Sequence, residues 1–101
     1  MTQPIIDLPK ESIEEFCHRW KVKELALFGS VLRADFRPDS DIDVLVTFKE
    51  GAGHSLFDLV DIEKDLRQIL GRKIDLVEKD GLRNPFRRHE ILRTMQVIYA
   101  A

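Results

Sequence analysis

Apolar residues recur along this chain at two spacings, and each spacing predicts a different kind of element. A helix face is indicated where apolar side chains lie three or four residues apart, as at Ile13, Phe16, Cys17 and Trp20. Short apolar runs between turn-forming residues are typical of strands. In chain order, the pattern predicts helices over 9–20, 31–34, 55–71 and 86–95, and strands over 24–28, 41–48, 73–77 and 96–99.

The third of these helices has the clearest boundaries. Ser55 with Asp58 three residues later is an N-terminal capping pattern, and Gly71 is a typical helix stop. We expect this helix to bury a broad apolar face, formed by Leu56, Leu59, Val60, Ile62, Leu66, Ile69 and Leu70. The element order predicts an α/β (α+β) fold, a small mixed sheet with helices packed on it, in which strand 41–48 is central. The order of the strands stays open.

Composition limits the class of protein. A chain of 101 residues predicts a single domain over 1–101, and a formal net charge of −2 argues against a dedicated nucleic-acid binder. A single cysteine excludes an internal disulfide and fits a reducing compartment. Neither a long apolar run nor a secretion signal is present, so we expect a cytoplasmic protein without membrane contact.

Two aspartates at the start of strand 41–48 are the first candidate for chemistry. Side chains alternate along a strand, so Asp41 and Asp43 are predicted to share one face while Ile42 points to the other. Like charges ~4 Å apart repel by about 1 kcal/mol in water and about 4 kcal/mol at an effective dielectric constant of 20. A divalent cation such as Mg²⁺ would relieve this repulsion. The simpler interpretation is that Asp41 only helps to form a turn.

Gly29 and Ser30 stand between strand 24–28 and the brief helix that follows. Gly29 lacks a Cβ and permits close approach of a phosphate, and free N–H groups at a helix start favour an anion. Taken alone, the pair is more simply interpreted as a strand-to-helix turn. Asp75, inside strand 73–77, is the candidate third carboxylate, either as metal ligand or as general base. Its simpler interpretation is an ion pair with Lys73 or an arginine.

Together these motifs resemble the signature of the polymerase-beta-like nucleotidyltransferase superfamily, and the whole chain is similar to the minimal nucleotidyltransferase (MNT) domains of prokaryotes. The matching segments are Leu27-Phe28-Gly29-Ser30, Arg33, Ser40-Asp41-Ile42-Asp43, Ser55-Leu56-Phe57-Asp58-Leu59 and Ile74-Asp75-Leu76-Val77. The resemblance implies a polymerase-beta-like nucleotidyltransferase fold. It also implies an antitoxin that transfers AMP from ATP to a tyrosine of a HEPN-domain ribonuclease toxin, as part of a hetero-oligomer.

The resemblance assigns roles to individual residues. Gly29, Ser30 and Arg33 would bind the nucleotide, while Asp41, Asp43 and Asp75 would be the catalytic residues and would hold two Mg²⁺ ions. Arg33 is followed by alanine where many relatives have glycine, which affects only the expected loop shape. Arg33 could equally stabilise its own loop through Asp35 or Asp39.

Three interpretations remain beside the main one. The chain could be a binding-only antitoxin that masks its toxin, or it could transfer a nucleotide to a small molecule or an RNA end.

The basic segment 83–93 is interpreted mainly as a solvated helix face, with an acidic partner or a triphosphate as the alternative. Nothing in the sequence identifies the base of the nucleotide.

Overall fold

A mixed sheet of four strands forms the centre of the molecule, here in a computed structural model that describes residues 8–32 and 41–101. The helices and strands follow in the order α1 (Lys10–Arg19), β1 (Val22–Phe28), η1 (Gly29–Leu32), β2 (Ile42–Phe48), α2 (Leu56–Leu70), β3 (Ile74–Glu78), η2 (Lys79–Gly81), α3 (Pro85–Thr94) and β4 (Gln96–Ala100). Each predicted helix or strand is present within a few residues of its predicted ends. The brief helix is a single 3₁₀ turn that begins two residues earlier than predicted.

The strand order is β3-β2-β1-β4, so β2 is an inner strand, as predicted. β1 pairs antiparallel with both β2 and β4, whereas β2 and β3 are parallel. The parallel pair requires a crossover, and α2 provides it. β3 and β4 are therefore the two edges of the sheet. This arrangement is the expected mixed sheet with helices packed on it.

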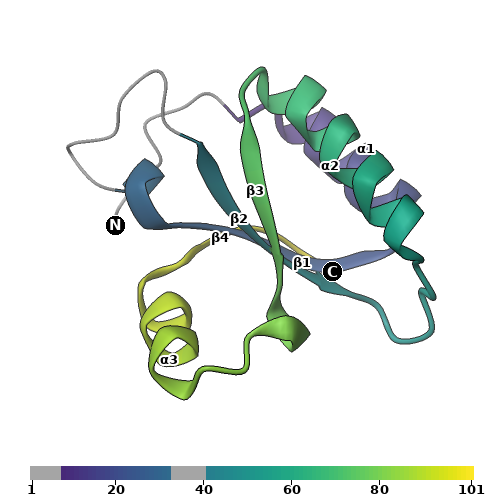
Figure 1. Cartoon of the computed structure of the whole chain (residues 1–101). Helices are drawn as coiled ribbons and strands as arrows, with labels where there is room; N and C mark the ends of the chain where they lie inside the picture. Colours follow the sequence, from purple (N-terminus) through teal and green to yellow (C-terminus); the bar gives the residue numbers. More distant parts are fainter. Residues whose placement is uncertain (1–7, 33–40) are drawn as a thin grey trace.

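The two faces of the sheet carry different cores. α1 and α2 cover one face and α3 covers part of the other (Figure 1). The core under α1 and α2 includes Phe16, Leu25, Val44 and Leu66 among its buried side chains. It also contains Cys17, and burial raises the pKa of that thiol to about 12. A smaller core under α3 is built on Ala26, Phe28, Leu45, Leu82 and Ile91.

α2 begins and ends as its sequence predicts. The Ser55 hydroxyl accepts a hydrogen bond from the Asp58 amide, and the Asp58 carboxylate accepts one from the Ser55 amide, which completes a capping box. The helix ends at Gly71, whose φ of 67° is left-handed. Among the described helices, none has the length and apolar character needed to cross a bilayer.

One prediction about α2 is wrong. Leu56 is 81% exposed and Val60 is 52% exposed, so the buried face does not include these two residues, although Leu59 between them packs against the core; Phe57 is 85% exposed. The reason is position around the helix axis. Leu56 and Val60 lie roughly a third of a turn or more away from the fully buried Ile62. They line a groove with Leu76 and Glu78 of β3 instead of entering the core.

Candidate functional site

Asp43 lies at the centre of the candidate site because of its position in the sheet. Along β2 it pairs with Phe28 of β1 on one side and with Asp75 of β3 on the other. Side chains of directly paired residues share a face, so Asp43 and Asp75 lie next to each other on adjacent strands about 4.8 Å apart. Their face is the α3 face, since Ile42, the residue before Asp43, is buried in the core under α1 and α2. Two of the three predicted carboxylates are thus brought together.

Gly29 touches Asp43, and this contact was not predicted from the sequence. The backbone of Gly29 has φ +74°, a conformation that L side chains rarely adopt. A Cβ at this position would collide with the Asp43 carboxylate. Glycine is therefore required here by the neighbouring carboxylate as well as by the turn. The motif pair Gly29 and Asp43 forms one structural unit, although 13 residues separate the two along the chain.

The other two aspartates are accessible. Asp41 is exposed and lies immediately before β2, where the amide of Ile42 donates to the carbonyl oxygen of Lys73. Asp75 is exposed on the edge strand β3. Within residues 8–32 and 41–101, Asp75 forms no ion pair with Lys73 or with an arginine. The simpler interpretation of Asp75 therefore has no support in this part of the chain.

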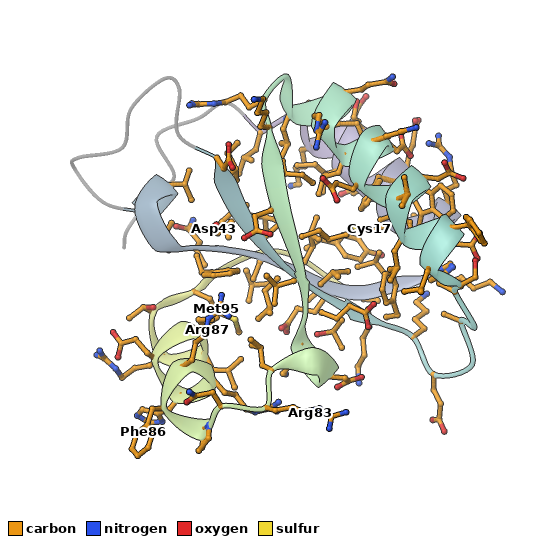
Figure 2. All side chains as sticks on the ribbon, in the orientation of Figure 1. Cys17, Asp43, Arg83, Phe86, Arg87 and Met95 are labelled. Atoms are coloured by element: carbon orange, nitrogen blue, oxygen red, sulfur yellow. The ribbon has the colours of Figure 1, made fainter. Side chains whose placement is uncertain are left out.

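A cleft of about 650 Å³ opens beside Asp43, between the sheet and α3. One wall is formed by Phe28, Gly29, Leu32 and Asp43, and the other by side chains of α3. Figure 2 shows Asp43 on the sheet and Arg87 on α3 at opposite sides of this space. The volume lies within the range of small-molecule sites. Asp41 and Asp75 are outside the lining, so the cleft adjoins the carboxylate pair at Asp43.

The α3 wall consists of residues that the sequence interpretation treated mainly as a solvated helix face: Arg87, Glu90, Ile91, Arg93 and Thr94. The polar members of this set are exposed, as that interpretation expects, and they also line the cleft. A signal was present, because positions 87, 90, 91 and 94 follow the helical spacing that puts residues on one face. On that face the buried Ile91 stands among polar side chains. α3 therefore packs on the smaller core through Ile91 and lines the cleft with polar side chains.

Charges on the α3 wall are partly compensated. One nitrogen of Arg93, Nη2, donates to both carboxylate oxygens of Glu90 at 2.9 Å. This hydrogen bond and the charge of Arg93 lower the pKa of Glu90 below its ordinary value. Among the described residues Arg87 has no such carboxylate partner, so the wall keeps a net positive charge that faces Asp43.

Two predicted nucleotide-binding residues, Ser30 and Arg33, lie partly or wholly outside the described residues. Ser30 belongs to η1, but its side chain lies outside the described residues, as does the whole of Arg33. η1 has four residues and starts at Gly29, so a brief helical turn is present where the anion prediction places one. The roles of Ser30 and Arg33 stay predictions.

The carboxylates fit a magnesium ion by chemistry and by register. Among the described residues, no three Asp, Glu, His or Cys side chains stand together as a metal-binding group. Mg²⁺, however, is usually held by one or two carboxylates together with substrate phosphates and water. The paired positions of Asp43 and Asp75 supply two such oxygen donors on one face. The donor set therefore suits an ion that is completed by a substrate.

Comparison with known proteins gives a consistent result. The model of the nucleotidyltransferase domain family matches residues 9–98. The protein adenylyltransferase MntA of Thermococcus cleftensis is 38% identical over 71 residues, which cover 70% of each chain.

Solved structures show the same fold. A candidate minimal nucleotidyltransferase has a TM-score of 0.71 and 36% identity, with 86% of each chain covered. A tri-AMPylated HEPN toxin of Shewanella oneidensis in complex with an MNT antitoxin gives a TM-score of 0.64 at 17% identity, covering 91% of this chain and 70% of that one. At that identity the likeness concerns the fold alone.

Proposed function

The chain belongs to the nucleotidyltransferase domain family, and from this premise we propose that it transfers AMP from ATP to a tyrosine hydroxyl of a HEPN-domain toxin, with Mg²⁺ as cofactor. The observation that carries the proposal is the placement of Asp43 and Asp75 in register on one sheet face. Gly29 touches the first of them, and a cleft large enough for a nucleotide opens at the same point.

The names of similar proteins support AMP as the transferred group and a HEPN toxin as the acceptor. The relative from T. cleftensis is a protein adenylyltransferase, so its acceptor is a protein and its transferred group is AMP. The complex from S. oneidensis contains an MNT antitoxin and a HEPN toxin that carries AMP groups. By analogy, the acceptor of this chain is a HEPN toxin, and the two form a hetero-oligomer in which this chain is the antitoxin.

Each candidate residue receives a role in this reaction. ATP occupies the cleft between the sheet and α3, and Gly29 leaves room for its phosphates beside Asp43. Ser30 and Arg33 contribute further phosphate contacts. Asp41, Asp43 and Asp75 would hold the Mg²⁺ ions, which would supply positive charge to offset the charge of the phosphates.

The reaction forms one bond and breaks one. The tyrosine oxygen attacks the α-phosphorus of ATP, and the bond from that phosphorus to the oxygen bridging the α- and β-phosphates breaks. AMP becomes attached to the acceptor, and pyrophosphate leaves. The hydroxyl proton passes to a carboxylate, for which we propose Asp75, because it is exposed at the sheet edge where an acceptor can approach.

A protein acceptor also suits the size of the domain. The chain has 101 residues, and the cleft is open to solvent. A small acceptor normally requires a pocket that encloses most of its surface. A partner protein that presents its own tyrosine at Asp75 does not need such enclosure.

The first prediction tests the carboxylates. Asp43→Asn and Asp75→Asn should each reduce the transfer of labelled AMP from ATP to the HEPN partner by about a hundredfold or more, because the metal supplies several kcal/mol of charge stabilisation. The measurement is incorporation of label from α-³²P-ATP into the partner. Asp61→Asn, an exposed carboxylate on α2, is the matched control and should transfer normally.

Unfolding curves must show that the variants fold as the unmodified chain does. Full transfer by both site variants would contradict the metal assignment. If the variants lose transfer but still neutralise the toxin on co-expression, masking rather than AMP transfer is the antitoxin mechanism.

A further inference from the structure

From the charges lining the cleft we propose that Arg87 binds the polyphosphate of the nucleotide, across the cleft from Asp43; this inference rests on the proposed function. The segment from Arg83 to Arg93 contains the arginines Arg83, Arg87, Arg88 and Arg93. Only some of them can serve a ligand in the cleft, and the contacts of each decide which.

Three of the four arginines either have a partner within the protein or lie away from the cleft. Arg93 lines the cleft but donates to both oxygens of Glu90, so this pair adds no net charge. Arg88 donates to the carbonyl oxygen of Lys79 at 3.3 Å and thereby ties α3 to η2. Arg83 is exposed in the link before α3 and does not line the cleft; Figure 2 shows it at the base of α3, away from Asp43.

Arg87 is the remaining cation, and its position is fixed by the helix. It lines the cleft, and within residues 8–32 and 41–101 its guanidinium has no hydrogen-bond or ion-pair partner. Its backbone amide donates to the Asn84 side chain, which caps α3. One turn later, Ile91 is buried against the sheet. The cap and the buried isoleucine hold the Arg87 backbone on both sides.

A phosphate chain is the ligand that fits these groups. A guanidinium binds phosphate oxygens through two parallel hydrogen bonds, and such charge-assisted bonds are the stronger class. Asp43 on the opposite wall repels a phosphate unless a cation lies between them, so the metal side and the Arg87 side contact the polyphosphate from different directions. Arg87 would then offset the negative charge of the polyphosphate, which the carboxylates on the opposite wall cannot do.

The experiment measures binding of ATP and of adenosine to the purified chain with Mg²⁺ in 0.15 M salt. At this ionic strength charges farther apart than about 8 Å are largely screened, so a distant arginine has little effect. Arg87→Gln should weaken ATP binding by about tenfold to a hundredfold and leave adenosine binding unchanged. Arg87→Lys should recover part of the loss. Arg83→Gln, an exposed arginine of the same segment, is the matched control and should bind ATP normally.

The other outcomes contradict the assignment. Equal losses for ATP and adenosine would mean that Arg87 shapes the cleft or stacks on the base. Equal effects of Arg87→Gln and Arg83→Gln would mean that only the general positive charge of α3 matters. If Arg87→Gln binds ATP as well as the unmodified chain, Arg87 has no role there and the proposed function stands. If the unmodified chain binds no ATP, the proposed function and the Arg87 assignment both fail.

Discussion

Gly29 and Asp43 occupy positions that depend on each other. The turn after β1 needs φ +74° at Gly29, and the Asp43 carboxylate fills the space where a side chain would begin. The left-handed backbone and the contact with Asp43 are thus two independent reasons for glycine at position 29. A carboxylate held against a backbone Cα has fewer accessible positions, which favours a fixed geometry for a metal or phosphate contact.

The second prediction separates these two reasons. Gly29→Ala should cost about 1–2 kcal/mol from the left-handed backbone alone, and more in total because the methyl group displaces Asp43. Gly51→Ala is the matched control, since Gly51 has φ +77° but open space around a Cβ. Urea unfolding measures both stabilities. AMP transfer should be lost in Gly29→Ala and retained in Gly51→Ala.

Equal stabilities and equal activities of these two variants would show that the Asp43 contact is unimportant. If Gly29→Ala loses AMP transfer while it remains folded under the assay conditions, the effect lies at the Asp43 carboxylate.

At the scale of elements, α2 has a buried face and an exposed flank. Leu66 is fully buried between α2 and the sheet, whereas Leu56 is 81% exposed. Both were predicted to belong to one apolar face. The apolar face of this helix is broader than the surface on which it packs, so side chains at its margin stay exposed.

The third prediction compares these two leucines. Leu66→Ala should lower the free energy of unfolding by about 2–5 kcal/mol, because a buried side chain leaves a cavity. Leu56→Ala should change it by about 0.5 kcal/mol or less, since little apolar area returns to water. Urea unfolding at one temperature measures both changes. A similar loss of unfolding free energy for the two substitutions would mean that the Leu56 side chain is buried in solution.

At the scale of the whole molecule, the sheet separates stability from chemistry. α1 and α2 bury the larger core on one face, while the carboxylate pair and the cleft use the end of the other face next to α3. Under the proposed function, substrate binding on the α3 face would not disturb the main core on the other face. It should, however, tie α3 to the sheet through Arg87 and Asp43.

Ligand-linked stability provides the fourth prediction. ATP with Mg²⁺ at about 100 times its dissociation constant should stabilise the fold by about 2.7 kcal/mol and raise the midpoint of thermal unfolding by about 10 °C or more. Addition of EDTA should remove most of this shift. The shift should also be small in Asp43→Asn. A shift that EDTA leaves unchanged would contradict binding of the nucleotide through magnesium.

Much of the fold and part of the site follow from local sequence. The helices and strands were predicted because their apolar spacings, caps and stops lie within each segment, as Ser55, Asp58 and Gly71 do for α2. The alternation of Ile42 and Asp43 between opposite faces is likewise a property of one strand. The sequence by itself therefore determined, within a few residues, where the helices and strands begin and end, and it supplied the candidate carboxylates.

Only the tertiary structure decided what these residues meet. Asp75 lies beside Asp43 because β2 and β3 pair in parallel in one particular register. Arg87 faces Asp43 because α3 folds back over the sheet, although 43 residues separate the two in sequence. Periodicity identifies an apolar or polar face but contains no information about the surface opposite to it. Contacts between distant segments depend on strand order and register, which are properties of the assembled sheet.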